Sequence, residues 1–160
     1  MGEGLDFVCS ECGERYSVKW GSGFRFHDDY RKCIQKLKKG KYGLEWKELF
    51  LSNKFVAIDA ENHIYLCKKC GHWEVEEGLS LYIPKNLDKI SKKIKESGKI
   101  LYVMDYELKS DYRLLKRRIH KCSKCGKVMH KANYEEELFL KCPKCGAIPR
   151  IENVSPIYWD

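Results

Sequence analysis

The sequence predicts an α+β fold made of two β-rich units, the first of which carries a helical insert. Three observations predict this fold. Four Cys-x-x-Cys-Gly motifs divide the chain, short segments of alternating apolar residues flank them, and one segment has the apolar spacing of an amphipathic helix. We expect residues 1–83 to form the first unit, with its insert at about 28–52. Residues 84–99 are expected to form a basic linker or helix, and residues 100–160 the second unit.

The helical insert is predicted between two β-rich stretches of the first unit. A strand is expected at residues 14–20, where apolar and polar side chains alternate. An amphipathic helix is expected over residues 28–39, because two aspartates begin it and apolar residues follow at i, i+3, i+4 and i+7 spacing. A second short helix is expected around residues 46–50.

Short strands are predicted for the remainder of both units. Residues 55–66 are expected to form a hairpin that leads into the second cysteine motif, and a further strand is expected at 79–83. Residues 100–104 predict the first strand of the second unit. Short strands before and after the third and fourth motifs would complete that unit.

Eight of the nine cysteines lie in the four motifs. Two thiolates that are two residues apart can bind one metal ion, and the following glycine lets the backbone turn beneath them. Two such motifs complete a tetrahedral Cys₄ site, so we expect two structural zinc ions per chain. The expected ligands are Cys9, Cys12, Cys67, Cys70, Cys122, Cys125, Cys142 and Cys145.

Sequence separation predicts how the motifs pair. Only 16 residues lie between Cys125 and Cys142, which suits one hairpin, so the third and fourth motifs are expected to share a site. The first and second motifs would then share the other site across the 54 residues between Cys12 and Cys67. The entropic cost of closing a loop rises by only about 0.6 kcal/mol per doubling of length, so this separation is no obstacle. Interleaved pairings stay open.

The motifs resemble those of a known superfamily. Residues Cys122–Gly126 and Cys142–Gly146 resemble the zinc-ribbon superfamily with knuckles of the rubredoxin type, and Cys9–Gly13 followed by Tyr16 has the same form. The whole chain is similar to small prokaryotic double zinc-ribbon proteins. The resemblance implies structural zinc but no single function, because zinc ribbons serve in transcription, ribosomes and tRNA-modifying enzymes, and as structural staples. Iron is the alternative metal that rubredoxin-type sites imply, and the basic surroundings here disfavour it.

The sequence predicts no active site. Two closed sets of four cysteines leave no open coordination position for a substrate. Residues 21–23 read Gly-Ser-Gly but lack the Gly-Lys-Ser/Thr of a phosphate loop, and the glutamates at 135–137 are expected at a hairpin tip. Cys33 lies on the apolar stripe of the first helix, where a buried and inert thiol is expected and a reactive one is the alternative. We expect a non-enzyme with no small-molecule substrate.

The charge distribution predicts a nucleic-acid partner. Residues 1–83 contain 13 basic and 13 acidic side chains, whereas residues 84–160 contain 18 and 10, so the second half carries the whole net charge of +8. Such a basic stripe can neutralise phosphates, although a solvated protein face is the alternative. The candidate nucleic-acid-binding residues are Lys116, Arg117, Arg118, Lys121, Lys124 and Lys127.

Aromatic residues of the first half predict a different partner. Eight of them lie between residues 20 and 55, and those not used in the core could anchor another protein. An exposed apolar patch around Trp20 and Phe24 would favour this adaptor role. No stretch approaches the ~18 apolar residues of a membrane span, and residues 1–6 lack the layout of a secretory signal. Metal-bound rather than disulfide-bonded cysteines then suit a cytoplasmic protein.

Overall fold

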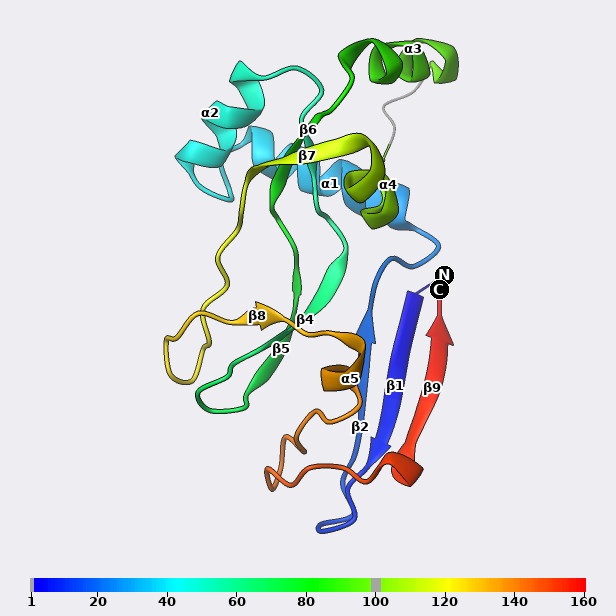
Figure 1. The fold of residues 1–160 in the computed structure, drawn as a ribbon, viewed down its shortest axis with the longest axis vertical. Coiled ribbons are helices and arrows are strands. Elements are labelled where there is room, and N and C mark those ends of the chain that lie inside the picture. Colours follow the sequence, from blue (N-terminus) through cyan, green and yellow to red (C-terminus); the bar gives the residue numbers. More distant parts are fainter. Residues whose placement is uncertain (1, 99–101) are drawn as a thin grey trace. The chain divides into compact units, whose positions relative to one another are not determined.

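The computed structural model describes residues 2–98 and 102–160 of the chain and confirms the expected α+β class. Within these residues, five α-helices and nine strands are present, and the strands form three separate sheets of three strands each (Figure 1). None of these helices has the length and apolar character that crossing a membrane requires.

The chain divides into two compact units, each assembled from segments that are distant in sequence. Unit 1 consists of Met1–Phe24, Asn62–Glu76 and Ile119–Asp160, and unit 2 consists of Arg25–Glu61 and Glu77–Arg118. The sequence predicts consecutive units, whereas the observed segments alternate along the chain. The reason is that the cysteine-bearing segments fold with one another. The segments between them also fold with one another, so the expected helical insert belongs to unit 2.

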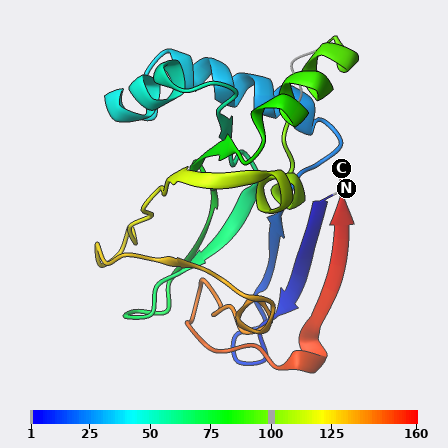
Figure 2. The same cartoon turned by 45° about the horizontal axis from the view of Figure 1, so that its top comes forward.

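Unit 1 contains two sheets, of strand order β2-β1-β9 and β5-β4-β8. Its strands are β1 (Gly2–Val8), β2 (Arg15–Trp20), β4 (Asn62–Leu66), β5 (Trp73–Glu77), β8 (His130–Lys131) and β9 (Val154–Trp159). A short helix, α5 (Tyr134–Glu137), and a 3₁₀ turn at Ile151–Asn153 complete the unit. Figures 1 and 2 both show β9 lying beside β1.

Strand β1 organises the core of unit 1. It pairs antiparallel with both β2 and β9, so that Phe7 lies opposite Tyr16 on one side and Val154 on the other. Alternate side chains of β2 are buried, Leu5 and Phe7 of β1 are buried, and the stacked rings of Phe7 and Tyr16 have centroids 4.8 Å apart. The strand expected at 14–20 is therefore confirmed as β2. Neither β1 nor β9 was expected, because neither segment alternates cleanly.

Unit 2 packs four helices against one sheet of strand order β3-β6-β7. Its helices are α1 (Phe26–Lys38), α2 (Leu44–Ser52), α3 (Leu87–Ser97) and α4 (Asp105–Asp111). Its strands are β3 (Ala57–Ile58), β6 (Leu81–Pro84) and β7 (Tyr112–Lys116). The two helices expected in the insert are confirmed as α1 and α2, and the expected basic linker forms α3.

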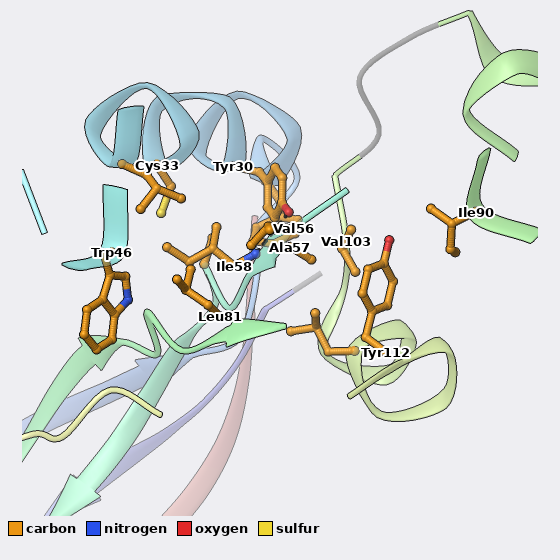
Figure 3. Packing of buried hydrophobic residues seen from close by; sticks show 14 residues of the cluster. Tyr30, Cys33, Trp46, Val56, Ala57, Ile58, Leu81, Ile90, Val103 and Tyr112 are labelled. Atoms are coloured by element: carbon orange, nitrogen blue, oxygen red, sulfur yellow. Dashed lines mark hydrogen bonds between the residues drawn. The ribbon is translucent and has the colours of Figure 1, made fainter. Parts of the chain in front are cut away.

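The core of unit 2 is apolar and contains none of the eight motif cysteines. Tyr30, Cys33 and Leu37 lie on the buried face of α1, as the sequence spacing predicts. Figure 3 shows Cys33 and Tyr30 projecting from α1 toward Ile58 and Leu81 of the sheet. Both sheet residues are completely buried, so this core can form without a metal ion.

Three strand predictions differ from the structure. No strand directly precedes the fourth motif, because residues 138–141 are not in a strand. The hairpin expected over residues 55–66 is not formed, because β3 pairs with β6 in unit 2 whereas β4 pairs with β8 in unit 1. A strand was also expected at residues 100–104. Residues 100 and 101 lie outside the described part of the chain, and residues 102–104 are not in a strand.

Candidate metal centres

The four cysteine motifs form two tetrads in unit 1. In each tetrad the four sulfur atoms all lie within 4.8 Å of one another. One tetrad, called here the outer tetrad, consists of Cys9, Cys12, Cys142 and Cys145. The other, the inner tetrad, consists of Cys67, Cys70, Cys122 and Cys125. The expected pairing of the first motif with the second and of the third with the fourth is therefore wrong.

Strand pairing explains why the motifs pair in this way. The first motif occupies the turn between β1 and β2, and pairing of β1 with β9 brings the C-terminal segment of the chain beside that turn. The second motif follows β4, and pairing of β4 with β8 places Leu66 opposite His130, just beyond the third motif. Sheet register, rather than sequence separation, selects which motifs meet.

All four motifs have the same backbone turn. In each one the glycine N–H donates to the carbonyl of the first cysteine at 2.8–2.9 Å. Each glycine has a φ of 70–77°, a left-handed conformation that would strain any residue with a Cβ atom. The glycines are Gly13, Gly71, Gly126 and Gly146. The sequence motif thus predicts this local geometry correctly.

The sulfur positions fit a tetrahedral metal ion. The Sγ–Sγ distances are 3.5 Å for Cys9–Cys145 and 3.7 Å for Cys12–Cys142 in the outer tetrad. In the inner tetrad they are 3.4 Å for Cys67–Cys125 and 3.6 Å for Cys70–Cys122. A metal ion with bonds of about 2.3 Å to four sulfurs places those sulfurs about 3.8 Å apart. The two sulfurs of a disulfide bond lie about 2.05 Å apart, so the tetrads are arranged for a metal ion rather than for disulfide bonds.

Backbone amides prepare each tetrad for an anionic ligand set. The N–H groups of Cys12 and Glu11 lower the pKa of the Cys9 thiol to about 7, against the cost of burial. The N–H of Cys70, likewise against the cost of burial, lowers the pKa of Cys67 to about 6. The Glu14 N–H also lowers the pKa of the Cys12 thiol, but desolvation and the neighbouring sulfurs together outweigh it and raise this pKa to about 12. One thiol of each tetrad therefore ionises easily, whereas complete deprotonation requires the charge of a metal ion.

Polar side chains join the two motifs of the inner tetrad. The Glu74 carboxylate, on β5, accepts a hydrogen bond from the Ser123 N–H at 3.1 Å and another from the Ser123 hydroxyl. His72 Nε2 lies 2.9 Å from the same carboxylate oxygen. These hydrogen bonds, the Ser123 hydroxyl first, hold the pKa of Glu74 below its ordinary value against the cost of partial burial. Neither Glu74 nor Ser123 could be identified from the sequence, because no local pattern links the two positions.

Aromatic side chains position the fourth motif. The Tyr16 hydroxyl donates to the Leu140 carbonyl at 2.8 Å, and Trp73 Nε1 donates to the Lys141 carbonyl at 2.8 Å. Both acceptors immediately precede Cys142. An ion pair between Lys144 and Glu14, 3.3 Å long, also joins the first and fourth motifs.

The six basic residues expected to bind nucleic acid divide between the two units. Lys121, Lys124 and Lys127 surround the third motif in unit 1, and the other three lie in unit 2. Lys116 forms a 2.8 Å ion pair with Glu45. Arg118 donates to the Tyr42 carbonyl at 2.9 Å, and its guanidinium lies 5.2 Å from the Trp46 ring centroid. Two of the six side chains are thus engaged within unit 2, while Arg117 is exposed.

The net positive charge lies on unit 2. Its segments contain 20 basic and 12 acidic residues, whereas those of unit 1 contain 11 of each. A divalent metal ion bound by four thiolates leaves a charge of about −2, so two loaded centres would give unit 1 a charge of about −4. The division into sequence halves concealed this separation, because each half contains parts of both units.

Four lysines gather at the turn between α1 and α2. Lys39 and Lys41 flank Gly40, the Lys41 N–H donates to the Lys36 carbonyl at 2.9 Å, and the Lys47 side chain packs over Gly40. We call Lys36, Lys39, Lys41 and Lys47 the α1–α2 lysine cluster. None of the four has a carboxylate partner among the described residues. The Lys-Lys-Gly-Lys run at residues 38–41 is the sequence signal that could have revealed it.

The comparison with known proteins finds no match. No family model, no curated protein and no solved structure matches the chain. Kinship with the zinc-ribbon superfamily therefore stays a prediction that rests on the four cysteine motifs.

Proposed function

We propose that this chain is a zinc-binding protein in which two Cys₄ centres stabilise unit 1, while the basic unit 2 binds the phosphate backbone of nucleic acid. The observation that carries the proposal is the charge separation between the units: the net +8 belongs to unit 2. The α1–α2 lysine cluster supplies positive charges that no carboxylate among the described residues neutralises.

The zinc assignment is supported by the donor set and its geometry. Eight thiolates in two tetrads, with the sulfur spacing given above, suit zinc. Four protein ligands at each centre leave no position for a substrate, so in this proposal both centres are structural and the chain is not an enzyme. Binding at such a site contributes on the order of 10 kcal/mol to folding.

A cleft in unit 1 is the competing surface for nucleic acid. It has a volume of about 490 Å³, and its walls include Lys124, Lys141 and Lys144. The same walls include Cys70 and Cys142, whose metal centres would carry negative charge. The cleft lysines therefore act mainly as counter-charges to the thiolates. The α1–α2 lysine cluster has no such compensation, which is why we place the phosphate contacts there.

Salt-dependent binding of fluorescent oligonucleotides tests the proposal. Four phosphate contacts give a slope of log K against log salt concentration of about −2.8 for single strands and −3.6 for duplex. Affinity should then fall about 50-fold to 150-fold between 50 and 200 mM salt. Replacing the four cluster lysines by glutamine should remove most of that slope.

The matched control changes the same number of lysines in unit 1. Lys69, Lys121, Lys124 and Lys127 are exposed, so their replacement by glutamine alters net charge equally. We expect this variant to keep the wild-type slope and both zinc ions. If the slope fell more in the control than in the cluster variant, the binding surface would lie in unit 1 instead. Binding that does not depend on salt would refute a phosphate contact altogether.

A protein-adaptor role is the second candidate. Phe24 is 81% exposed, which is unusual for a large apolar side chain and favours contact with another macromolecule. Trp20, in contrast, packs partly against the core of unit 1. Substituting Phe24 by serine should leave oligonucleotide affinity unchanged if nucleic acid binds through unit 2.

A further inference from the structure

Unit 2 contains an apolar cavity that the nucleic-acid proposal does not use. Its volume is about 280 Å³, and its walls come from all four helices of the unit and from the chain around β3. Ile34, Val56, Ile90, Ile94 and Val103 supply aliphatic surface, and five aromatic rings complete the lining. Pockets that bind small organic molecules are typically of this kind: concave, mostly apolar and equipped with a few polar groups.

One of the charged side chains at the cavity is a lysine whose ammonium lies beside an aromatic ring. Lys93 and Glu107 both contribute to the wall, and they form an ion pair with each other. Lys38 also lines the cavity, and its ammonium lies 5.9 Å from the centroid of the Phe50 ring. Lys38 has no carboxylate partner among the described residues. An anionic group at the cavity would therefore find a cation beside an aromatic wall.

The tyrosine hydroxyls add polar groups to the same cavity. The Tyr30 hydroxyl lies 3.4 Å from the Ile58 N–H, from which it accepts a hydrogen bond. Figure 3 shows the Tyr112 hydroxyl directed toward the space between Val103 and Ile90. These hydroxyls are few compared with the apolar surface, so the bulk of a ligand must be apolar.

A strained residue forms part of the wall. Phe55 has a φ of 53°, a left-handed conformation that is rare for a bulky side chain. Such conformations cost on the order of 1–3 kcal/mol and are concentrated at ligand-binding and other functional sites. Here the strained backbone places the Phe55 ring in the cavity wall.

We propose that unit 2 binds an amphipathic monocarboxylate, whose apolar part fills the cavity and whose carboxylate is held by Lys38. The volume equals that of about nine water molecules in the liquid, and a methylene group is of similar size, so a chain of about eight to ten carbons fits. The sequence alone revealed no such site, because its walls come from segments spread between residues 30 and 112.

Calorimetric titration with decanoate and decanol, below their aggregation concentrations, tests the proposal. A hydrogen bond to a charged group contributes about 1.5–3 kcal/mol, so decanoate should bind at least about tenfold more tightly than decanol. The Lys38→Gln variant should reduce this preference to about twofold or less. Lys39→Gln is the matched control, because Lys39 is the next residue along the chain but does not line the cavity.

A second measurement locates the ligand without any substitution. In the wild-type protein, decanoate should shift the methyl NMR signals of Ile34, Ile90 and Ile94 and leave those of Ile64, in unit 1, unchanged. Ile94→Trp, which fills the cavity, should weaken binding of both ligands at least about tenfold. Equal affinity for decanoate and decanol, equal effects of the two lysine variants, or shifts confined to unit 1 would each overturn the proposal. Absence of binding by either ligand would also overturn it.

Discussion

Chelating the metal ions should unfold unit 1 and leave unit 2 folded. All eight motif cysteines lie in unit 1, whereas the core of unit 2 contains only Cys33. Of the 44 α-helical residues that the structure describes, 40 belong to α1–α4 in unit 2. Removing the metal should therefore abolish the tertiary structure of unit 1 at nearly constant helix content.

The loss of folding stability that unit 2 suffers when unit 1 unfolds can be estimated from the structure. When unit 1 unfolds, Asn62–Glu76 becomes a flexible loop of 15 residues that joins the two segments of unit 2. The ends of that loop stay close, because the Gly78 N–H donates to the Glu61 carbonyl at 3.0 Å. The length-dependent cost of closing such a loop is about 2.4 kcal/mol. A domain of ordinary stability, about 5–15 kcal/mol, tolerates this loss.

Titration with a strong chelator, followed by far-UV circular dichroism and hydrogen exchange, checks this prediction. We expect about nine tenths of the helical signal to persist, with protection retained in α1 and lost in β1 and β4. Adding zinc back should restore protection in both strands. Loss of more than half of the helical signal together with the metal would refute the reasoning, since it would mean that unit 2 depends on the metal centres.

Two further predictions concern Cys33 and Glu74. Burial raises the pKa of the Cys33 thiol to about 11. In the presence of chelator at neutral pH, a thiol reagent should therefore modify the eight motif cysteines quickly and Cys33 slowly. Equally fast modification of all nine cysteines would contradict this prediction. The pKa of Glu74 is lowered in the folded protein. Its ionised carboxylate therefore stabilises the folded state above the pKa of the unfolded chain, about 4.3, and this stabilisation is lost as pH falls through the pKa of the folded state. Glu74→Gln should therefore destabilise zinc-loaded unit 1 in urea at neutral pH and flatten its acid-side stability profile. An unchanged profile would show that the Ser123 and His72 contacts contribute nothing.

Local geometry could be predicted from the sequence because it depends on neighbouring residues. The Cys-x-x-Cys-Gly motif specifies its own turn, since the glycine supplies the left-handed φ and the N–H groups of the turn point at the sulfurs. The apolar spacing of Tyr30, Cys33 and Leu37 likewise identified the buried face of α1. Each of these features is encoded within about ten residues.

Long-range pairing could not be predicted in the same way. The motif partners depend on β1 pairing with β9, which are separated by most of the chain, and neither segment has a clear strand pattern. Loop-closure entropy favours the pairing of neighbouring motifs, but its free-energy differences are small beside those of a complete sheet and core. The apolar cavity was missed for the same reason, because its walls come from segments spread between residues 30 and 112. The α1–α2 lysine cluster is local in sequence, but the comparison of the two halves hid it, because the first half has no net charge.

The pairing of the motifs is the central claim, and cadmium NMR tests it directly. In protein loaded with the NMR-active isotope of cadmium, each metal couples through bonds to the β-protons of its own cysteine ligands. We expect two cadmium signals, one correlated with Cys9, Cys12, Cys142 and Cys145 and the other with the remaining four motif cysteines. A cadmium signal correlated with both Cys12 and Cys70 would contradict the observed pairing.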